Sequence, residues 1–210
     1  MKTKSILSAI ILNVALFLPF SGIGQSDNPN PVTFPQGANV LNLGVGIGGT
    51  YDGWGPGYTQ TPEFVLSYEN GTFGNVGPGT ISLGALVAYT GTAYTYYDGN
   101  SGYSYSNRWN YWVVGFRSAY HWNFTSSTKF DPYAGLMLGY YIVNYSHTTN
   151  DPYAAHPGDP GYVYYESSYP NYVSLSLFIG ARYYISERVG IWAELGYGYS
   201  NLALGVSFKL

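Results

Sequence analysis

Residues 189–210 read VGIWAELGYGYSNLALGVSFKL, and this stretch decides the fold. Every second residue from 189 to 199 is apolar or aromatic, and most of the residues between them are Gly. The alternation returns from 202 to 210, now on even positions instead of odd ones. A period of two is typical of a strand whose two faces meet different surroundings. The change of parity predicts a hairpin with a two-residue turn at Ser200 and Asn201, which pairs Tyr199 with Leu202.

Six earlier segments show the same alternation, and no window of the chain after residue 38 carries the 3.6-residue stripe of an amphipathic helix. The fold class that we predict is therefore all-β, an eight-stranded antiparallel up-and-down transmembrane β-barrel formed by residues 39–210. The expected strands cover residues 41–48, 64–69, 81–90, 112–122, 134–142, 173–185, 189–199 and 202–210.

The start of the chain has the features of an export signal. Two lysines precede an apolar run at 6–20, and small glycines follow where cleavage before Gln25 requires them. A membrane-anchoring helix is the alternative, but the run is shorter than the roughly 20 residues that span a bilayer. We predict a signal peptide at 1–24, followed by a flexible periplasmic leader at 25–38 that is rich in Asn, Pro and Ser.

The composition excludes several classes of protein. Only 9% of the 210 residues are charged and the net charge is −3, so the chain offers no basic surface for nucleic acid. Without cysteine, the chain has no disulfide, thiolate metal site or cysteine nucleophile. The 46% hydrophobic content also argues against disorder.

The two faces of the strands distinguish a membrane barrel from a soluble, lipocalin-like barrel. The less apolar face is mostly Gly, Ser and Ala, which suits a narrow lumen and would be an unusually uncharged surface in water. The other face has aliphatic residues at mid-strand and aromatic residues toward the ends, as in the girdles of transmembrane barrels. The expected girdle residues are Tyr68, Tyr89, Tyr120, Trp122, Tyr183, Tyr197 and Tyr199.

An even number of strands places both ends of the chain on the same side of the membrane. For an exported protein of the outer membrane, we expect this to be the periplasmic side. The expected extracellular connections are residues 52–60, 98–107, 148–170 and the tight last turn, and the periplasmic ones are residues 70–79, 125–129 and 186–187.

Three sequence runs carry a family resemblance: GFRSAYHW at 115–122, DPYAGLMLGY at 131–140 and GVSFKL at 205–210. With the signal peptide and eight alternating strands, the chain resembles the small outer-membrane β-barrel proteins of Gram-negative bacteria, the OmpX/OmpA-type group. The resemblance implies insertion by the barrel-assembly machinery and contact with outer-membrane lipid. Members of this group serve adhesion, structural support, narrow channels and, in a few cases, lipid modification, so the resemblance indicates location and leaves activity open.

Six charged or titratable side chains fall on the predicted lumen face: Glu69, Arg117, His121, Arg182, Glu194 and Lys209. Buried ions must be paired to offset their desolvation, and an eight-stranded interior is just wide enough for side chains to fill it. We expect Arg182 to reach Glu194 diagonally across a hairpin. The preferred interpretation is a structural polar network, and a gated or proton-conducting path is the alternative.

The predicted extracellular segments are rich in Tyr, which offers rigid contact area with a polar tip. The candidate aromatic surface comprises Tyr94, Tyr96, Tyr103, Tyr105, Tyr164 and Tyr165. Alternation continues through residues 92–96, as if the sheet projected beyond the membrane. We expect a surface for a glycan or protein ligand, and the alternative is that these residues only make protruding strands tolerant of water.

These observations predict a noncatalytic, monomeric outer-membrane protein for surface interaction or envelope structure. A narrow channel is the second hypothesis and a lipid-modifying enzyme the third. No cofactor, metal or catalytic residue is expected, because Gly44, Gly46 and Gly49 match a dinucleotide motif only within a strand, with no following helix.

Overall fold

The computed structural model describes residues 32–49, 57–123, 127–152 and 170–210. Its nine strand segments are β1 (Asn39–Ile47), β2 (Tyr58–Gln60), β3 (Glu63–Val76), β4 (Gly79–Tyr97), β5 (Ser104–Trp122), β6 (Phe130–Thr149), β7 (Tyr172–Tyr184), β8 (Val189–Tyr197) and β9 (Leu202–Lys209). The described ranges contain no helix that is long and apolar enough to cross a bilayer.

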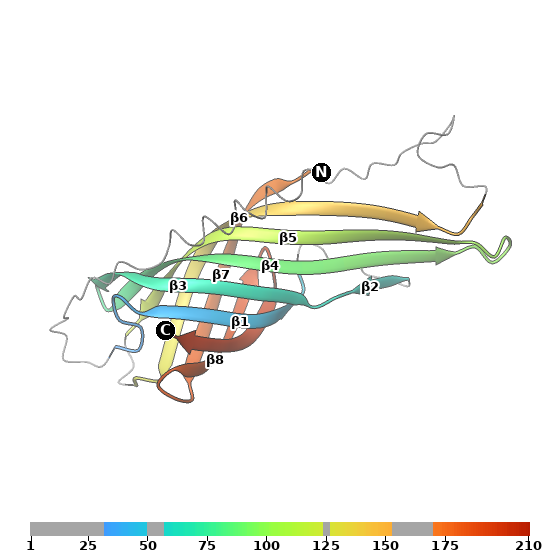
Figure 1. The fold of residues 1–210 in the computed structure, drawn as a ribbon. Coiled ribbons are helices and arrows are strands. Elements are labelled where there is room, and N and C mark those ends of the chain that lie inside the picture. The colour runs from blue at the N-terminus through green and yellow to red at the C-terminus, as the bar shows by residue number, and fades with distance from the viewer. Residues whose placement is uncertain (1–31, 50–56, 124–126, 153–169) are drawn as a thin grey trace.

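The strands close into one antiparallel barrel (Figure 1). The order β4-β3-β1-β9-β8-β7-β6-β5 returns to its start through the β4–β5 pairing. β2 and β3 pair with successive parts of the same strand, β4, so they count as one interrupted strand of the barrel. The predicted eight-stranded antiparallel barrel is therefore confirmed. We call the end where β1 begins and β9 finishes the terminal end, and the opposite end the loop end.

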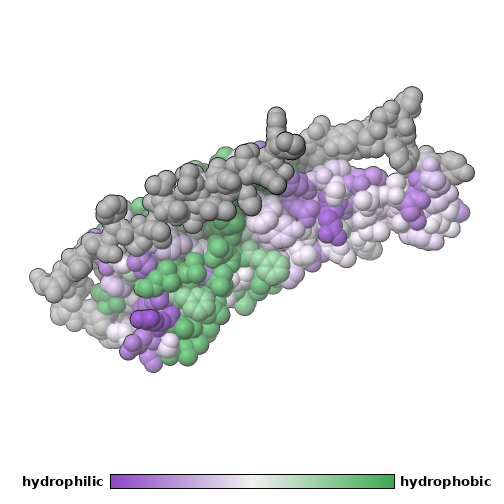
Figure 2. Space-filling model, viewed as in Figure 1, coloured by the Kyte–Doolittle hydropathy of each residue, from purple (hydrophilic) through white to green (hydrophobic). Residues whose placement is uncertain are grey.

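The two faces of the barrel are inverted relative to a soluble protein. Leu175, Leu177 and Ile179 on β7 point outward and are 55–60% exposed, whereas Ser176 and Arg182 on the same strand are buried. On the face shown in Figure 2, hydrophobic residues gather in a band over the barrel, with hydrophilic residues at its lower left end and intermediate to hydrophilic ones over the projecting part on the right. An apolar exterior around a polar interior is the arrangement that hydrocarbon requires, so the barrel is of the transmembrane kind.

Three strands are longer than the sequence predicted. β4 and β5 have 19 residues each and β6 has 20, against 8 or 9 in β1, β8 and β9. These three strands run past the barrel at the loop end (Figure 1). We call this projecting part, residues 92–97, 104–110 and 143–149, the sheet extension, and β2 pairs with its β4 edge.

Two predicted connections are wrong. The expected periplasmic link at 70–79 is largely strand, because β3 continues to Val76 through two register shifts and turns at Gly77, which has φ +59°. The expected two-residue turn at 200–201 is also wrong, because the last β8–β9 pair is Leu195 with Leu202 and residues 198–201 connect the two strands. The conformation of this connection depends on Gly198, whose φ of +127° other residues rarely adopt.

Before β1, residues 32–38 pack against the terminal end. Thr33 and Phe34 are buried there, so this end of the predicted leader does not hang free. The predicted signal peptide at 1–24 and the rest of the leader lie outside the described residues.

Candidate functional site

Five of the six predicted lumen residues meet inside the barrel, near its terminal end. Glu69 comes from β3, Arg117 and His121 from β5, Arg182 from β7 and Glu194 from β8, and each is no more than 3% exposed. Each occupies an inward position of a strand, so the period of two places them all in one enclosed space. We call these five residues together with Asp131 the lumen network.

Arg117 joins two carboxylates. Its Nη2 lies 2.6 Å from Oε1 of Glu194 and 3.3 Å from Oε1 of Glu69. Its guanidinium also lies over the ring of Phe178, 4.2 Å from the centroid, which fills the lumen beside the ion pairs. Tyr133 donates a further hydrogen bond to Glu194 at 3.0 Å, so this carboxylate is held from two sides.

Arg182 does not pair with Glu194 as the hairpin geometry predicted. Its Nη1 lies 2.7 Å from Oδ2 of Asp131, and its Nη2 lies 3.5 Å from Oε1 of Glu69. The remaining donors reach Ser207 at 3.0 Å and the amide oxygen of Asn42 at 3.3 Å. Asp131 is the direct cross-strand neighbour of Arg182 in the β6–β7 pairing, whereas Glu69 reaches Arg182 from β3 across the lumen.

His121 bridges a hydroxyl and two carboxylates. Its Nδ1 lies 2.8 Å from Oδ1 of Asp131, and its Nε2 lies 3.0 Å from Oγ of Ser82 and 3.4 Å from Oε2 of Glu69. The Ser–His–Asp part has the connectivity of a nucleophile, a base and an orienting acid. However, all of these groups are at most 1% exposed, and the ring of Phe34 stacks on His121 with centroids 3.9 Å apart. A nucleophile needs an adjacent space for the reacting carbonyl, and this serine has none that is open to solvent.

Lys209 is the predicted lumen residue that stays apart. Its Nζ donates to the carbonyl of Thr33 at 3.1 Å and lies 3.9 Å from the centroid of Tyr184. Among the described residues it makes no ion pair with a carboxylate, because it lies at the last position of β9 beside the packed N-terminal segment.

Several buried residues were not predicted for the lumen, among them Asp131, Tyr199 and Phe34. Asp131 shares the inward parity of Tyr133 and Met137, so extending the expected β6 by three residues would have revealed it. Tyr199 was expected in the outer girdle, but it turns inward beyond Gly198 and donates to Oε2 of Glu194 at 2.8 Å. Phe34 gave no signal, since it is an isolated aromatic residue in a polar segment.

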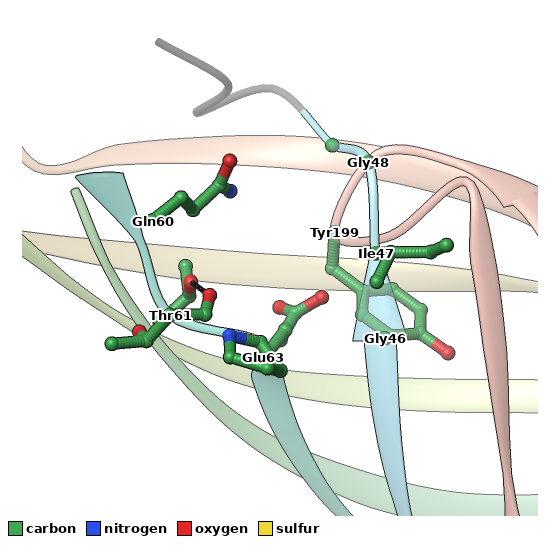
Figure 3. Close-up of a pocket in the computed structure, with 10 residues that line it drawn as sticks. Gly46, Ile47, Gly48, Gln60, Thr61, Glu63 and Tyr199 are labelled. Carbon is green, nitrogen blue, oxygen red and sulfur yellow. Dashed lines mark hydrogen bonds between the residues drawn. The ribbon is translucent and has the colours of Figure 1, made fainter. Parts of the chain in front are cut away.

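A small pocket of about 160 Å³ lies at the loop end of the barrel (Figure 3). Glu63 at the start of β3 and Tyr199 in the β8–β9 loop both line it, together with Thr90 of β4. Gly46 also lines it from within β1, so Gly44 and Gly46 of the apparent dinucleotide motif belong to a barrel strand as expected, whereas Gly49 lies just after the strand. The described residues contain no group of His, Asp and Glu side chains suited to a metal ion.

The sheet extension carries three of the six predicted surface tyrosines, Tyr94, Tyr96 and Tyr105, and Tyr103 lies in the turn at its tip. The other two, Tyr164 and Tyr165, lie outside the described residues. Tyr96 is 51% exposed and its neighbour Tyr97 is 65% exposed, whereas Tyr103 and Tyr105 are partly covered. The rings of Tyr96 and Tyr105 stack across β4 and β5 with centroids 6.4 Å apart, and the ring of Tyr94 packs against Tyr58.

The acids next to the sheet extension, Asp98 and Asp151, accept hydrogen bonds from nearby residues. Tyr105 donates to Oδ2 of Asp151 at 2.7 Å, and this bond to a carboxylate raises the pKa of Tyr105 to about 12. Asp98 accepts from the hydroxyl of Ser101 at 2.7 Å and from the backbone N–H of Asn100 at 3.0 Å, and both bonds lower the pKa of Asp98. The turn at the tip of the β4–β5 hairpin is therefore held by hydrogen bonds to the Asp98 side chain.

Comparisons with known proteins found no matching family model and no matching curated protein. Among solved structures, the chain is similar to a protein from the de novo design of transmembrane β-barrels, at 16% identity and TM-score 0.41, covering 83% of this chain and 97% of that one. It is also similar to the outer-membrane protein Ail of Yersinia pestis in a phospholipid bilayer nanodisc, at 12% identity and TM-score 0.42, covering 83% and 100%. A second structure of Ail, in complex with the heparin analogue sucrose octasulfate, matches at 11% identity and TM-score 0.38, covering 83% and 96%. At these identities the likeness is one of fold alone.

Proposed function

We propose that this chain is an exported, monomeric, noncatalytic protein of the bacterial outer membrane that binds an extracellular partner through its sheet extension. The barrel anchors the extension in the lipid, and the lumen network holds the barrel closed. The predicted signal peptide and the apolar exterior support this location.

The extension is the observation that carries the proposal. Spanning a bilayer takes about 9–11 residues of a tilted strand, and β4, β5 and β6 have nearly twice that length. The additional residues remain paired in full register from Thr92 with Trp109 to Tyr97 with Ser104. A paired, twisted sheet in water is more rigid than a loop, so the contact area of its aromatic residues is ordered before a partner binds.

The chemistry of the extension favours an uncharged partner. The extension carries Arg108 and His147, and Asp98 and Asp151 lie just beyond its strand ends, so these described residues form no concentrated positive patch for a sulfated or phosphorylated ligand. Exposed tyrosines such as Tyr96 and Tyr97 stack on sugar rings or on apolar side chains and offer a hydroxyl to either. A neutral glycan or an uncharged protein segment fits this surface.

One edge of the extension offers a second mode of contact. β5 pairs with β6 as far as Thr149, whereas β7 pairs with β6 only as far as Tyr141 within the described residues. The stretch of β6 from residue 142 to 149 therefore extends beyond its β7 neighbour. An extended peptide could add to such an edge by main-chain hydrogen bonds.

Paired substitutions test the aromatic surface. The protein is reconstituted in nanodiscs and screened on an array of neutral glycans and short peptides. Tyr96→Ser with Tyr97→Ser is expected to weaken binding by about tenfold or more, since stacked aromatic contacts contribute about 1 kcal/mol each. The matched control, Tyr96→Phe with Tyr97→Phe, keeps the rings and is expected to retain most of the affinity. Equal binding by the Ser and wild-type proteins would refute the proposal for this surface.

The location has its own test. The protein is expected to fractionate with outer membranes and to migrate differently on a gel before and after boiling, as a closed barrel resists detergent until heated. Recovery in the soluble fraction with no shift on boiling would contradict the membrane assignment.

A further inference from the structure

The N-terminal segment before β1 enters the terminal end of the barrel. Thr33 is 4% exposed and Phe34 is not exposed at all, although Pro35, Gln36 and Gly37 immediately after them are exposed. Two residues are thus anchored inside the barrel and joined to β1 by a short strap that lies in solvent.

Phe34 covers the lumen network directly. Its ring stacks on His121 with an interplanar angle of 9° and centroids 3.9 Å apart, and the guanidinium of Arg182 lies 5.7 Å from its centroid. These contacts place an apolar ring between the network and the terminal opening. Water can reach His121 and Arg182 from that side only when the ring moves.

Thr33 holds the anchor at the barrel rim through three hydrogen bonds. The single proton of its hydroxyl is shared between the carbonyls of Ser127 at 2.7 Å and Phe130 at 3.0 Å, and its own carbonyl accepts from Lys209 at 3.1 Å. These partners come from the β5–β6 connection, the start of β6 and the end of β9, so the anchor ties together both sides of the opening.

The neighbouring strand is shaped to receive the strap. A Cβ at Gly71 would overlap the carbonyl of Pro35, and a Cβ at Gly74 would lie 2.8 Å from Cβ of Gln36. Both glycines fall where β3 departs from regular pairing with β4. Gly37, with φ +82°, provides a position at which the strap can change direction.

We propose that residues 33–36 are a removable plug that controls access to His121, Asp131 and Arg182 from the terminal end, with Gly37 as its hinge. A short segment that is held by two buried side chains, next to an exposed strap, opens locally at low cost relative to the whole fold. Behind the plug, the Arg117 guanidinium on the ring of Phe178 forms a second layer across the lumen. Withdrawal of the plug therefore opens a blind chamber that contains the inner groups and does not open a through-channel.

Chemical modification of His121 tests the plug. The nanodisc-reconstituted protein is treated with diethyl pyrocarbonate, and modification of each histidine is followed by peptide mass spectrometry. His147, which is exposed on the sheet extension, is the internal reference. In the wild type, His121 is expected to react far more slowly than His147. Phe34→Ala is expected to raise the relative rate at His121 by about tenfold or more, because it removes the buried ring that holds the closed state.

Two further variants keep the test decisive. Gln36→Ala is the matched control on the same strap, because it removes only an exposed hydrogen bond to the carbonyl of Thr72, and it is expected to leave His121 protected. Gly71→Ala displaces the strap while Phe34 remains, and it is expected to expose His121 as Phe34→Ala does. A gel-shift on boiling confirms that each barrel is folded. The proposal is overturned if His121 stays as protected in both folded plug variants as in the wild type, or if wild-type His121 already reacts like His147.

Discussion

Removing the positive charge of Arg182 should destabilise the barrel strongly. Of its two carboxylate partners, Asp131 should account for most of the loss. Arg182 and its two carboxylate partners, Asp131 and Glu69, are at most 1% exposed, so water cannot replace a lost contact. After Arg182→Met, Glu69 still has Arg117 at 3.3 Å and His121 at 3.4 Å, whereas Asp131 keeps only His121. Breaking a buried pair by removing one partner costs about 3–5 kcal/mol, and we expect a loss of this size in the free energy of unfolding.

The second partner offers a rescue. Adding Asp131→Asn to Arg182→Met removes the uncompensated charge while an amide remains beside His121. The double variant should recover all but about 1–2 kcal/mol of the wild-type free energy of unfolding, since removing both members of a buried pair is far less costly than removing one. Lys209→Met is the control at the same end of the barrel. It loses a bond to a carbonyl and an aromatic contact and no carboxylate pair, so about 1–2 kcal/mol is expected.

The measurement is equilibrium folding into phospholipid vesicles across a urea gradient, followed by tryptophan fluorescence and by the gel-shift on boiling. The reasoning is refuted if Arg182→Met unfolds within about 1 kcal/mol of the wild type, below the range for a broken buried pair. It is also refuted if the double variant is no more stable than Arg182→Met alone.

Three other predictions follow from the lumen and the extension. The reconstituted wild-type protein should show no steady unitary currents in a planar bilayer, because Arg117 and Phe178 fill the lumen, and regular unitary steps would contradict the filled lumen. A fluorophosphonate probe should not label Ser82, which is 1% exposed, and labelling abolished by Ser82→Ala would contradict the noncatalytic assignment. In 13Cζ NMR spectra of Tyr-labelled protein, the Tyr105 resonance is identified by its loss in Tyr105→Phe, and it should titrate near pH 12. The hydrogen bond from Tyr105 to Asp151 should be fully present below the ordinary tyrosine pKa of about 10 and should be lost as the pH rises through 12. Asp151→Asn should return this titration toward pH 10, and an unchanged value would contradict the assigned cause.

The sequence predicted the fold and the face of each strand because a period of two leaves little freedom. Once the alternation of a strand is recognised, Glu69 and Arg117 must point away from the aliphatic face, and the structure places both in the lumen. The inference holds residue by residue without knowledge of the neighbouring strand. It fails where the period is interrupted, as at Gly198, after which Tyr199 lies inside instead of outside.

The partners within the lumen could not be predicted in the same way. Arg182 was expected to reach Glu194 across their shared hairpin, but it contacts Asp131, while Glu194 contacts Arg117. Asp131 lies directly opposite Arg182 in the β6–β7 register, but the expected strand began at residue 134 and left Asp131 out of that pairing. The contact between Arg117 and Glu194 joins β5 and β8 across the lumen, so it depends on strand tilt and on the stagger at closure, which a single hairpin does not contain. Phe34 lies still further from any local pattern, since its contact with His121 joins segments 87 residues apart and its own segment shows no alternation.

The polar lumen has a role that needs no substrate or ion flow. Lipid provides little hydrophobic driving force for a barrel to choose one strand register over another, since both sides of an aliphatic strand could meet hydrocarbon. Charged residues on the inward positions favour one register, because a slip of one residue would carry Arg117 on β5 or Arg182 on β7 to the lipid face. A basic side chain there costs about 2–4 kcal/mol at the bilayer midplane, and its former partners would remain buried without a cation. The lumen network therefore penalises each neighbouring register, which explains why several of the few charges in this chain are buried together.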